Sequence, residues 1–201
     1  MTVLNLLFVC TGNICRSPSA EFLLRTELNE RLGDEAKKIS ISSAGLGTPG
    51  GWELDPEIAR LLEGQRINGQ EFRSRPVDAD LLGEADLILT GTKQHRLGIG
   101  ADFPDAYQRT FTMREAALLL ARPETMQLPP YDLLERGRAA VALLQRSRGT
   151  RSLADHELDI NDPHGRRTAA YEAMFSQVRG VVGTLAFVLA PAIVRGSHFS
   201  G

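Results

Sequence analysis

The stretch that decides the fold runs from Leu4 to Pro18 and reads LNLLFVCTGNICRSP. Its first six residues form an apolar run with the length of a buried strand in a parallel sheet. Ser17 is a suitable helix N-cap, Pro18 suits the first helical position, and apolar residues follow at helical spacing. The stretch therefore predicts a strand, a tight loop and a helix. Such a loop directs backbone N–H groups and the positive end of the helix dipole toward one point, where an oxyanion can bind.

Two side chains bring chemistry to this loop: Cys10 begins it and Arg16 ends it. Converging N–H dipoles and a guanidinium stabilise a thiolate, so we expect Cys10 to be a nucleophile at neutral pH. Arg16 has a planar fork that matches two oxygens of a phosphoryl group. Gly12 and Asn13 tolerate the positive φ that an inward-facing loop needs. A Cys-x5-Arg spacing by itself fits equally well a buried structural cysteine near a surface arginine.

The joint pattern from Val9 to Glu21 resembles the phosphate loop of the low-molecular-weight protein tyrosine phosphatases. The signature of that family, Val-Cys-x-Gly-Asn-x-Cys-Arg-Ser-Pro-x-Ala-Glu, is matched at every fixed position. The resemblance implies a cysteine-dependent hydrolase without a cofactor, in which Cys10 is the nucleophile and Arg16 holds the phosphate. The residues that it implies for phosphate binding are Thr11, Gly12, Asn13, Ile14, Cys15 and Ser17.

The resemblance also implies supporting roles around the loop. Ser17 would form a hydrogen bond with the Cys10 thiolate, while Asn13 and Ser43 would tether the loop. The alternatives are that Ser17 only caps the helix and that Ser43 is only a turn residue. Cys15 either forms a reversible disulfide with Cys10 or is a small buried apolar residue.

The expulsion of an alcohol or phenol by a thiolate needs a positioned proton donor. The family carries an Asp-Pro pair just before its last helix, and here that pair is Asp162-Pro163. Asp162 would protonate the leaving group and then activate the water that hydrolyses the cysteinyl-phosphate; an ordinary turn residue is the alternative. No metal is expected, because no His, Cys and carboxylate cluster at ligand spacing is visible along the sequence.

The residues at the mouth of the site bear on the substrate. Trp52, in a glycine-rich loop, offers a ring on which phosphotyrosine can stack, or it anchors the loop. His164-Gly165 stands where many family members have two aromatic residues. Thr11, Thr90-x-Thr92 and the Asp-Pro-x-Gly pattern also resemble the bacterial protein arginine phosphatases. We therefore predict phosphotyrosine in proteins as the substrate and keep phosphoarginine as the alternative.

Two further classes of function could use a loop of this kind. Related loops serve thioredoxin-coupled arsenate reductases, but that chemistry needs further cysteines outside the loop, and Cys10 and Cys15 are the two cysteines of the chain. A non-catalytic phosphate-binding module would keep its phosphate binding in a Cys10→Ser variant, whereas an enzyme would lose turnover.

Composition excludes several kinds of partner. The 201 residues suffice for one domain, and 42% hydrophobic with 24% charged residues is typical of a globular protein. A net charge of −2 predicts neither nucleic-acid nor membrane binding. Both cysteines lie in one loop, so the chain has no disulfide framework, and its start shows no signal-peptide pattern. These features predict a cytoplasmic protein. The apolar segment 181–194 is shorter than a membrane span and predicts a buried core helix.

Alternating strand and helix patterns predict an α/β three-layer sandwich with a four-stranded parallel sheet and helices on both faces. Cys10 then lies at the carboxyl end of the first strand, where such sheets bind ligands. We expect one phosphatase domain over 1–195, with an insertion at 122–160 and a tail at 196–201. The expected strands are 4–9, 38–45, 85–90 and 109–111, and helices are expected to begin near residues 17, 55, 81, 94, 112, 131 and 166.

Overall fold

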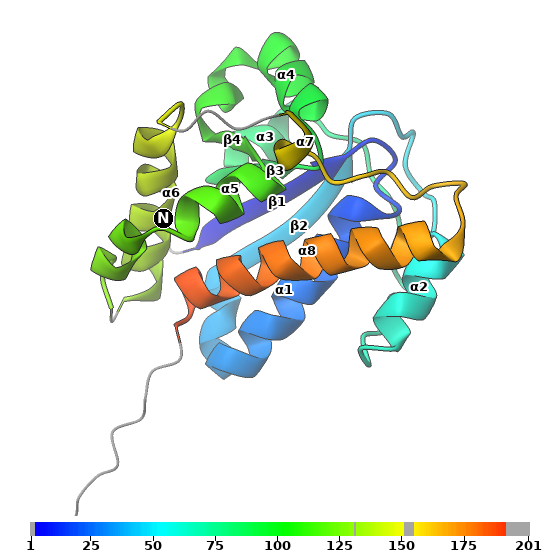
Figure 1. Cartoon of the computed structure of the whole chain (residues 1–201), viewed down its shortest axis with the longest axis horizontal. Coiled ribbons are helices and arrows are strands. Elements are labelled where there is room, and N and C mark those ends of the chain that lie inside the picture. The colour runs from blue at the N-terminus through cyan, green and yellow to red at the C-terminus, as the bar shows by residue number, and fades with distance from the viewer. Residues whose placement is uncertain (1–2, 131, 151–154, 192–201) are drawn as a thin grey trace, which may run out of the picture.

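The protein is described by a computed structural model that covers residues 3–130, 132–150 and 155–191 (Figure 1). Its centre is a four-stranded sheet in the order β2-β1-β3-β4, in which every neighbouring pair is parallel. The strands are β1 (Leu4–Cys10), β2 (Ile39–Gly45), β3 (Leu87–Thr90) and β4 (Thr110–Thr112). The predicted single-domain fold with a four-stranded parallel sheet is confirmed.

Helices cover both faces of the sheet, as the alternating pattern predicts. The α-helices are α1 (Arg16–Leu32), α2 (Pro56–Glu63), α3 (Ala79–Glu84), α4 (Lys93–Asp102), α5 (Met113–Leu120), α6 (Leu133–Ser147), α7 (Asp155–Leu158) and α8 (Thr168–Leu189). Short 3-10 segments occupy η1 (Gly33–Lys38), η2 (Pro104–Arg109) and η3 (Pro123–Gln127).

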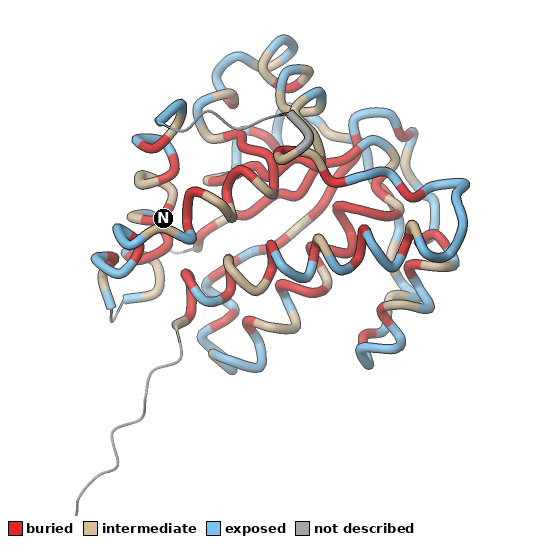
Figure 2. Tube along the Cα trace, in the orientation of Figure 1, coloured by how far each residue is buried: buried red, intermediate tan, exposed pale blue. Residues whose placement is uncertain are grey.

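The two layers of core follow from the two-residue period of β1. Leu6 and Phe8 point to the face covered by α1, α5 and α8, whereas Leu7 and Val9 point to the face covered by α3 and α4. Because both faces are buried, the strand reads as a continuous apolar run instead of an alternating one. Figure 2 shows the buried residues gathered along the sheet and on the inner sides of the helices.

The last helix, α8, is the one helix within the described ranges that is long and apolar enough to cross a membrane. Half of the most apolar 18-residue stretch of this helix is buried inside the protein, and the helix packs against α1 and α5. Figure 1 shows it lying along α1 across one face of the sheet. The burial explains its composition, and the prediction of a buried core helix is confirmed for residues 181–189; residues 192–194 of the predicted segment lie outside the described residues.

Helix starts are set by side-chain caps at most positions. The Asp55 side chain accepts a hydrogen bond from Glu57 N at 3.0 Å at the start of α2, and Thr112 with Glu115 forms the predicted capping box of α5. The prediction that Ser17 is the N-cap of the first helix is wrong. Helix α1 begins at Arg16 with Cys15 in the N-cap position, and Ser17 lies inside the first turn.

The described parts of the segment 122–160 lead away from the phosphate loop and then back to it. Helix α6 packs at the opposite end of β1, where Gly137 closely approaches Leu4, and Arg136 donates hydrogen bonds to carbonyl groups of Val188 and Leu128. Residues 151–154 lie outside the described residues, and the short helix α7 that follows them leads back to the site. The predicted tail, 196–201, lies outside the described residues.

Candidate active site

The loop between β1 and α1 lies where the order of the sheet reverses direction. The chain passes from β1 to β2 on one side and later to β3 on the other, so a crevice opens at the carboxyl ends of β1 and β3. Asn13 has φ 53°, as predicted for an inward-facing loop. Gly45 ends β2 beside this loop, and a Cβ there would lie 2.6 Å from Thr11 O. The glycine therefore allows the loop backbone to approach.

Asn13 holds the loop in this shape. Its side-chain amide donates to Ser43 Oγ at 2.8 Å and to Ser17 Oγ at 3.0 Å, and its carbonyl oxygen accepts from Arg75 N at 3.0 Å. Ser43 Oγ in turn donates to Glu21 Oε2 at 2.5 Å. Asn13 is completely buried, so these contacts are shielded from water. The geometry matches the tethering that the resemblance implies for Asn13 and Ser43; Glu21 and Arg75 were not predicted.

Cys10 lies on the floor of a pocket of about 190 Å³. Its Sγ lies 3.0 Å from Ser17 Oγ, so a hydroxyl is positioned to stabilise the sulfur. Only 1% of Cys10 is exposed to bulk solvent, and the pocket is the route by which a substrate reaches it. The Cys15 side chain does not cap α1, Pro18 has no N–H group and Ser19 N donates to Cys15 O, so the N–H groups of Arg16 and Ser17 are the ones that the first turn offers to a ligand.

Arg16 lies beside this sulfur and is buried, with 4% of its side chain exposed. Its Nη2 nitrogen donates hydrogen bonds to Asp162 Oδ2 at 2.6 Å and to Thr11 Oγ1 at 3.3 Å. The Nε nitrogen is buried and has no partner among the described residues. An unsatisfied buried donor is costly, and an oxyanion in the pocket would satisfy it.

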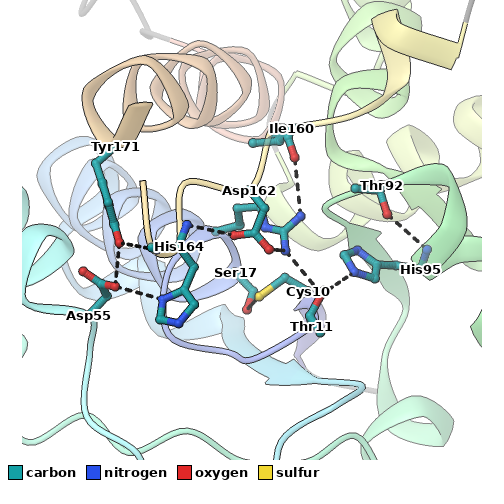
Figure 3. A network of polar contacts seen from close by, with 12 residues as sticks. Cys10, Thr11, Ser17, Asp55, Thr92, His95, Ile160, Asp162, His164 and Tyr171 are labelled. Carbon is teal, nitrogen blue, oxygen red and sulfur yellow. Dashed lines mark hydrogen bonds and ion pairs between the residues drawn. The ribbon is translucent and has the colours of Figure 1, made fainter. Parts of the chain in front are cut away.

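Asp162 reaches the pocket from the loop that precedes α8, as Figure 3 shows. That loop is held against the sheet because Ile160 N donates to Gly91 O, just beyond β3, at 2.8 Å. The side chain of Asp162 is half-exposed, and its ion pair with Arg16 places a carboxylate over the mouth of the pocket. The structure thus brings Asp162, which is 146 residues from Arg16 in the sequence, to the loop that carries Cys10 and Arg16.

His95, near the start of α4, was not predicted. Its Nε2 shares a hydrogen bond of 2.9 Å with Thr11 Oγ1, and burial, together with the charge of Arg16, lowers its pKa to about 4. His95 is therefore neutral near pH 7 and orients the Thr11 hydroxyl without adding charge. Its position three residues after the Thr92 cap, at the carboxyl end of β3, is the sequence feature that indicates proximity to the loop.

A second unpredicted group lies on the other side of Cys10 (Figure 3). Asp55 Oδ2 accepts hydrogen bonds from Tyr171 OH at 2.9 Å and from His164 Nδ1 at 3.2 Å. Burial and the hydrogen bond to Asp55 raise the pKa of Tyr171 to about 12. Burial, followed by the charge of Asp55, raises the pKa of the Cys15 thiol. These contacts fix the segment after Asp162 against α2 and α8.

The remaining predicted residues line the pocket or its rim. Gly12, Ile14 and Cys15 form part of the wall together with Thr11, and Trp52 stands at the rim with 47% of its surface exposed. Asp159 lies three residues before Asp162 in the sequence. Its carboxylate accepts a hydrogen bond from Lys93 N at 2.7 Å, at the start of α4.

A parallel α/β sheet with a strand–loop–helix that presents a thiol and an arginine to one pocket defines a cysteine-dependent phosphatase of the phosphate-loop kind. The comparison with family models agrees: the model described as "Low molecular weight phosphotyrosine protein phosphatase" matches residues 5–118. The chain belongs to this family, and Cys10 is the cysteine of its loop.

Two curated relatives and one solved structure are similar to the chain. The chain is 31% identical over 137 residues to EpsP of Ralstonia nicotianae, a probable low molecular weight protein-tyrosine-phosphatase. The matched region covers 66% of this chain and 89% of that relative. It is 33% identical over 112 residues to the protein-arginine-phosphatase of Bacillus subtilis, covering 56% and 71%. The YwlE arginine phosphatase from Geobacillus stearothermophilus superposes with a TM-score of 0.63 at 26% identity, covering 91% and 90%.

Proposed function

We propose that this chain hydrolyses phosphotyrosine in proteins through a cysteinyl-phosphate intermediate. The observation that carries the proposal is the pocket of about 190 Å³ that has Cys10 on its floor and the Arg16–Asp162 pair in its wall. Cys10 is the nucleophile, Arg16 binds the phosphoryl oxygens, and Asp162 is the general acid and then the general base. The loop residues Thr11 to Cys15 and Ser17 surround the phosphoryl group.

Substrate binding exchanges one partner of Arg16 for another. The guanidinium now contacts the Asp162 carboxylate at 2.6 Å, and its buried Nε has no partner in the described part of the chain. Two phosphoryl oxygens fit Nε and Nη2 as a bidentate pair. This exchange frees the carboxyl of Asp162 to face the leaving oxygen, and a protonated Asp162 donates to that oxygen as its bond to phosphorus breaks.

The two chemical steps use the same groups in opposite directions. In the first, Cys10 Sγ forms a bond to phosphorus while the phosphorus–oxygen bond of the substrate breaks, and Ser17 Oγ stabilises the sulfur before attack. In the second, Asp162 removes a proton from water, which attacks phosphorus and expels the thiolate, so that inorganic phosphate leaves. The Arg16 guanidinium and the N-terminus of α1 stabilise the equatorial oxygens in both steps.

The rim of the pocket supports phosphotyrosine as the substrate. The half-exposed Trp52 gives a flat apolar surface beside the mouth, on which a phenol ring can stack. Phosphoarginine is the second candidate, supported by the relative named an arginine phosphatase.

Matched peptides test the choice of substrate. Two peptides of the same sequence, one with phosphotyrosine and one with phosphoarginine, are compared by kcat/KM, with Cys10→Ser as the inactive control. We expect faster release of phosphate from phosphotyrosine, and Trp52→Ala should lower kcat/KM for that peptide about tenfold, the effect of losing roughly 1.4 kcal/mol of ring contact. Faster hydrolysis of phosphoarginine would overturn the assignment.

Free thiols at Cys10 and Cys15 support action in the cytoplasm.

A further inference from the structure

Three side chains that can bind a metal meet beside the pocket, although they come from distant parts of the chain. Cys15 precedes α1, Asp55 caps α2, and His164 follows Pro163 in the loop before α8. One ligand atom from each, the thiol sulfur, a carboxylate oxygen and a ring nitrogen, lies within 4.8 Å of the other two. Sequence spacing could not reveal this group, because 109 residues separate His164 from Asp55.

We propose that Cys15, Asp55 and His164 form a Zn²⁺ site whose occupation inhibits the phosphatase. Thiolate, carboxylate and imidazole are the protein ligands that Zn²⁺ uses, and three of them plus a water complete a tetrahedral site. His164 Nδ1 already lies 3.2 Å from Asp55 Oδ2. Zinc bonds of about 2.0–2.1 Å at tetrahedral angles would hold these two atoms roughly 3.3 Å apart, so this edge of the site is formed in advance.

The surroundings suit such an ion. Asp55 is buried and fixed by hydrogen bonds from Tyr171 OH at 2.9 Å and Glu57 N at 3.0 Å, the kind of outer contacts that orient ligating carboxylates. His164 has 64% of its side chain exposed, so its ring can move toward the Cys15 sulfur. Both Cys15 and His164 line the pocket, which gives the ion a route of entry and leaves its fourth position open to water.

Zinc binding exchanges protons and bonds but involves no oxidation or reduction. The Cys15 S–H bond breaks, its proton passes to solvent, and the sulfur binds zinc. The ring proton of His164 moves by exchange with solvent from Nδ1, where it is shared with Asp55, to Nε2, so that the Nδ1 lone pair binds the ion. Asp55 exchanges its hydrogen bond with His164 for a bond to the metal and keeps the one from Tyr171.

Inhibition follows from the position of the site and rests on the proposed function. His164 is two residues from Asp162, and His164 N donates to Asp162 Oδ1 at 3.3 Å. A metal that fixes His164 to Cys15 would hold this loop in place and narrow the pocket above Cys10. The same loop must let Asp162 leave Arg16 for the substrate, so turnover should fall.

Metal binding is tested first, independently of activity. Co²⁺ replaces zinc as a spectroscopic probe and is added to a Cys10→Ser variant, which removes the reactive thiolate. We expect a thiolate-to-cobalt charge-transfer band that disappears when Cys15 is also changed to Ser. Tyr171→Phe in the Cys10→Ser background should weaken binding about tenfold, because it removes an outer contact of the Asp55 ligand. No band, or a band that survives Cys15→Ser, would overturn the site even if the enzyme is a phosphatase.

Inhibition is tested second, on p-nitrophenyl phosphate with increasing Zn²⁺ and reversal by a chelator. We expect His164→Phe to raise the zinc concentration for half-inhibition at least tenfold, each variant being compared with its own zinc-free rate. His95→Gln is the matched control and should leave that concentration unchanged. Equal sensitivity of wild type and His164→Phe would mean that zinc acts on Cys10 alone, which would overturn the proposal.

Discussion

Replacement of Asn13 by Ala tests how the phosphate loop is held. Asn13 is fully buried and makes three hydrogen bonds, to Ser17, to Ser43 and from Arg75 N. Each of the first two contributes about 1 kcal/mol, and leaving the Arg75 N–H without an acceptor costs about 1–3 kcal/mol. The φ of 53° adds about 1–2 kcal/mol for an alanine. We expect the free energy of unfolding to fall by about 4 kcal/mol, the low end of this range, because Ser17 and Ser43 keep other partners.

Urea denaturation measures the loss, and kcat on p-nitrophenyl phosphate, taken well below the unfolding transition, should fall at least tenfold because Ser17 loses its position beside Cys10. Asn13→Gly should be more stable than Asn13→Ala, since relief of strain outweighs the added chain entropy of glycine. Asn68→Ala, at an exposed turn with one local hydrogen bond, is the matched control and should cost less than about 1 kcal/mol. A loss below about 1 kcal/mol for Asn13→Ala with unchanged kcat would refute this account of the loop.

Three other changes test the groups around the pocket. Asp162→Asn should lower kcat/KM, which reports the first chemical step, by about 10²–10⁴ on phenyl phosphate and much less on p-nitrophenyl phosphate, since the better leaving group needs less protonation; equal losses in kcat/KM would place the acid elsewhere. The folded-state pKa of His95 is lowered to about 4 from 6.5, so the unfolded chain binds more protons between these values, stability rises with pH across this window, and His95→Gln should flatten that rise in thermal unfolding. A slope unchanged by the substitution would contradict the burial of His95. Tyr171→Phe removes the donor to Asp55 and should lower the free energy of unfolding by about 1–3 kcal/mol in urea; an unchanged midpoint would show that the contact contributes nothing.

The strands and most helix starts could be predicted because their causes are local. The apolar run of β1 and the capping box at Thr112 lie within a few residues of the element they define. The N-cap of α1 was predicted wrongly because its local signal is ambiguous. Ser17 and Pro18 fit two helix registers, and only the hydrogen bonds of Ser17 with Cys10 and Asn13 show that its hydroxyl serves the loop.

The part of the site outside the loop depends on distant contacts. Cys10, Arg16 and Asp162 could be named from motifs, whereas His95, Tyr171 and the Asp55 contacts arise only when β3, α2 and α8 meet at one edge of the sheet. No local period or spacing carries that information.

The transfer of the phosphoryl group to sulfur is the step that a single experiment can observe directly. An Asp162→Asn variant, slowed in hydrolysis of the intermediate, is mixed with labelled p-nitrophenyl phosphate, whose leaving group needs little protonation, and quenched within one turnover; the labelled peptide is identified by mass spectrometry. Our account predicts the phosphoryl group on the sulfur of Cys10 and none in Cys10→Ser. A label on another residue, or turnover without a labelled protein, would contradict it.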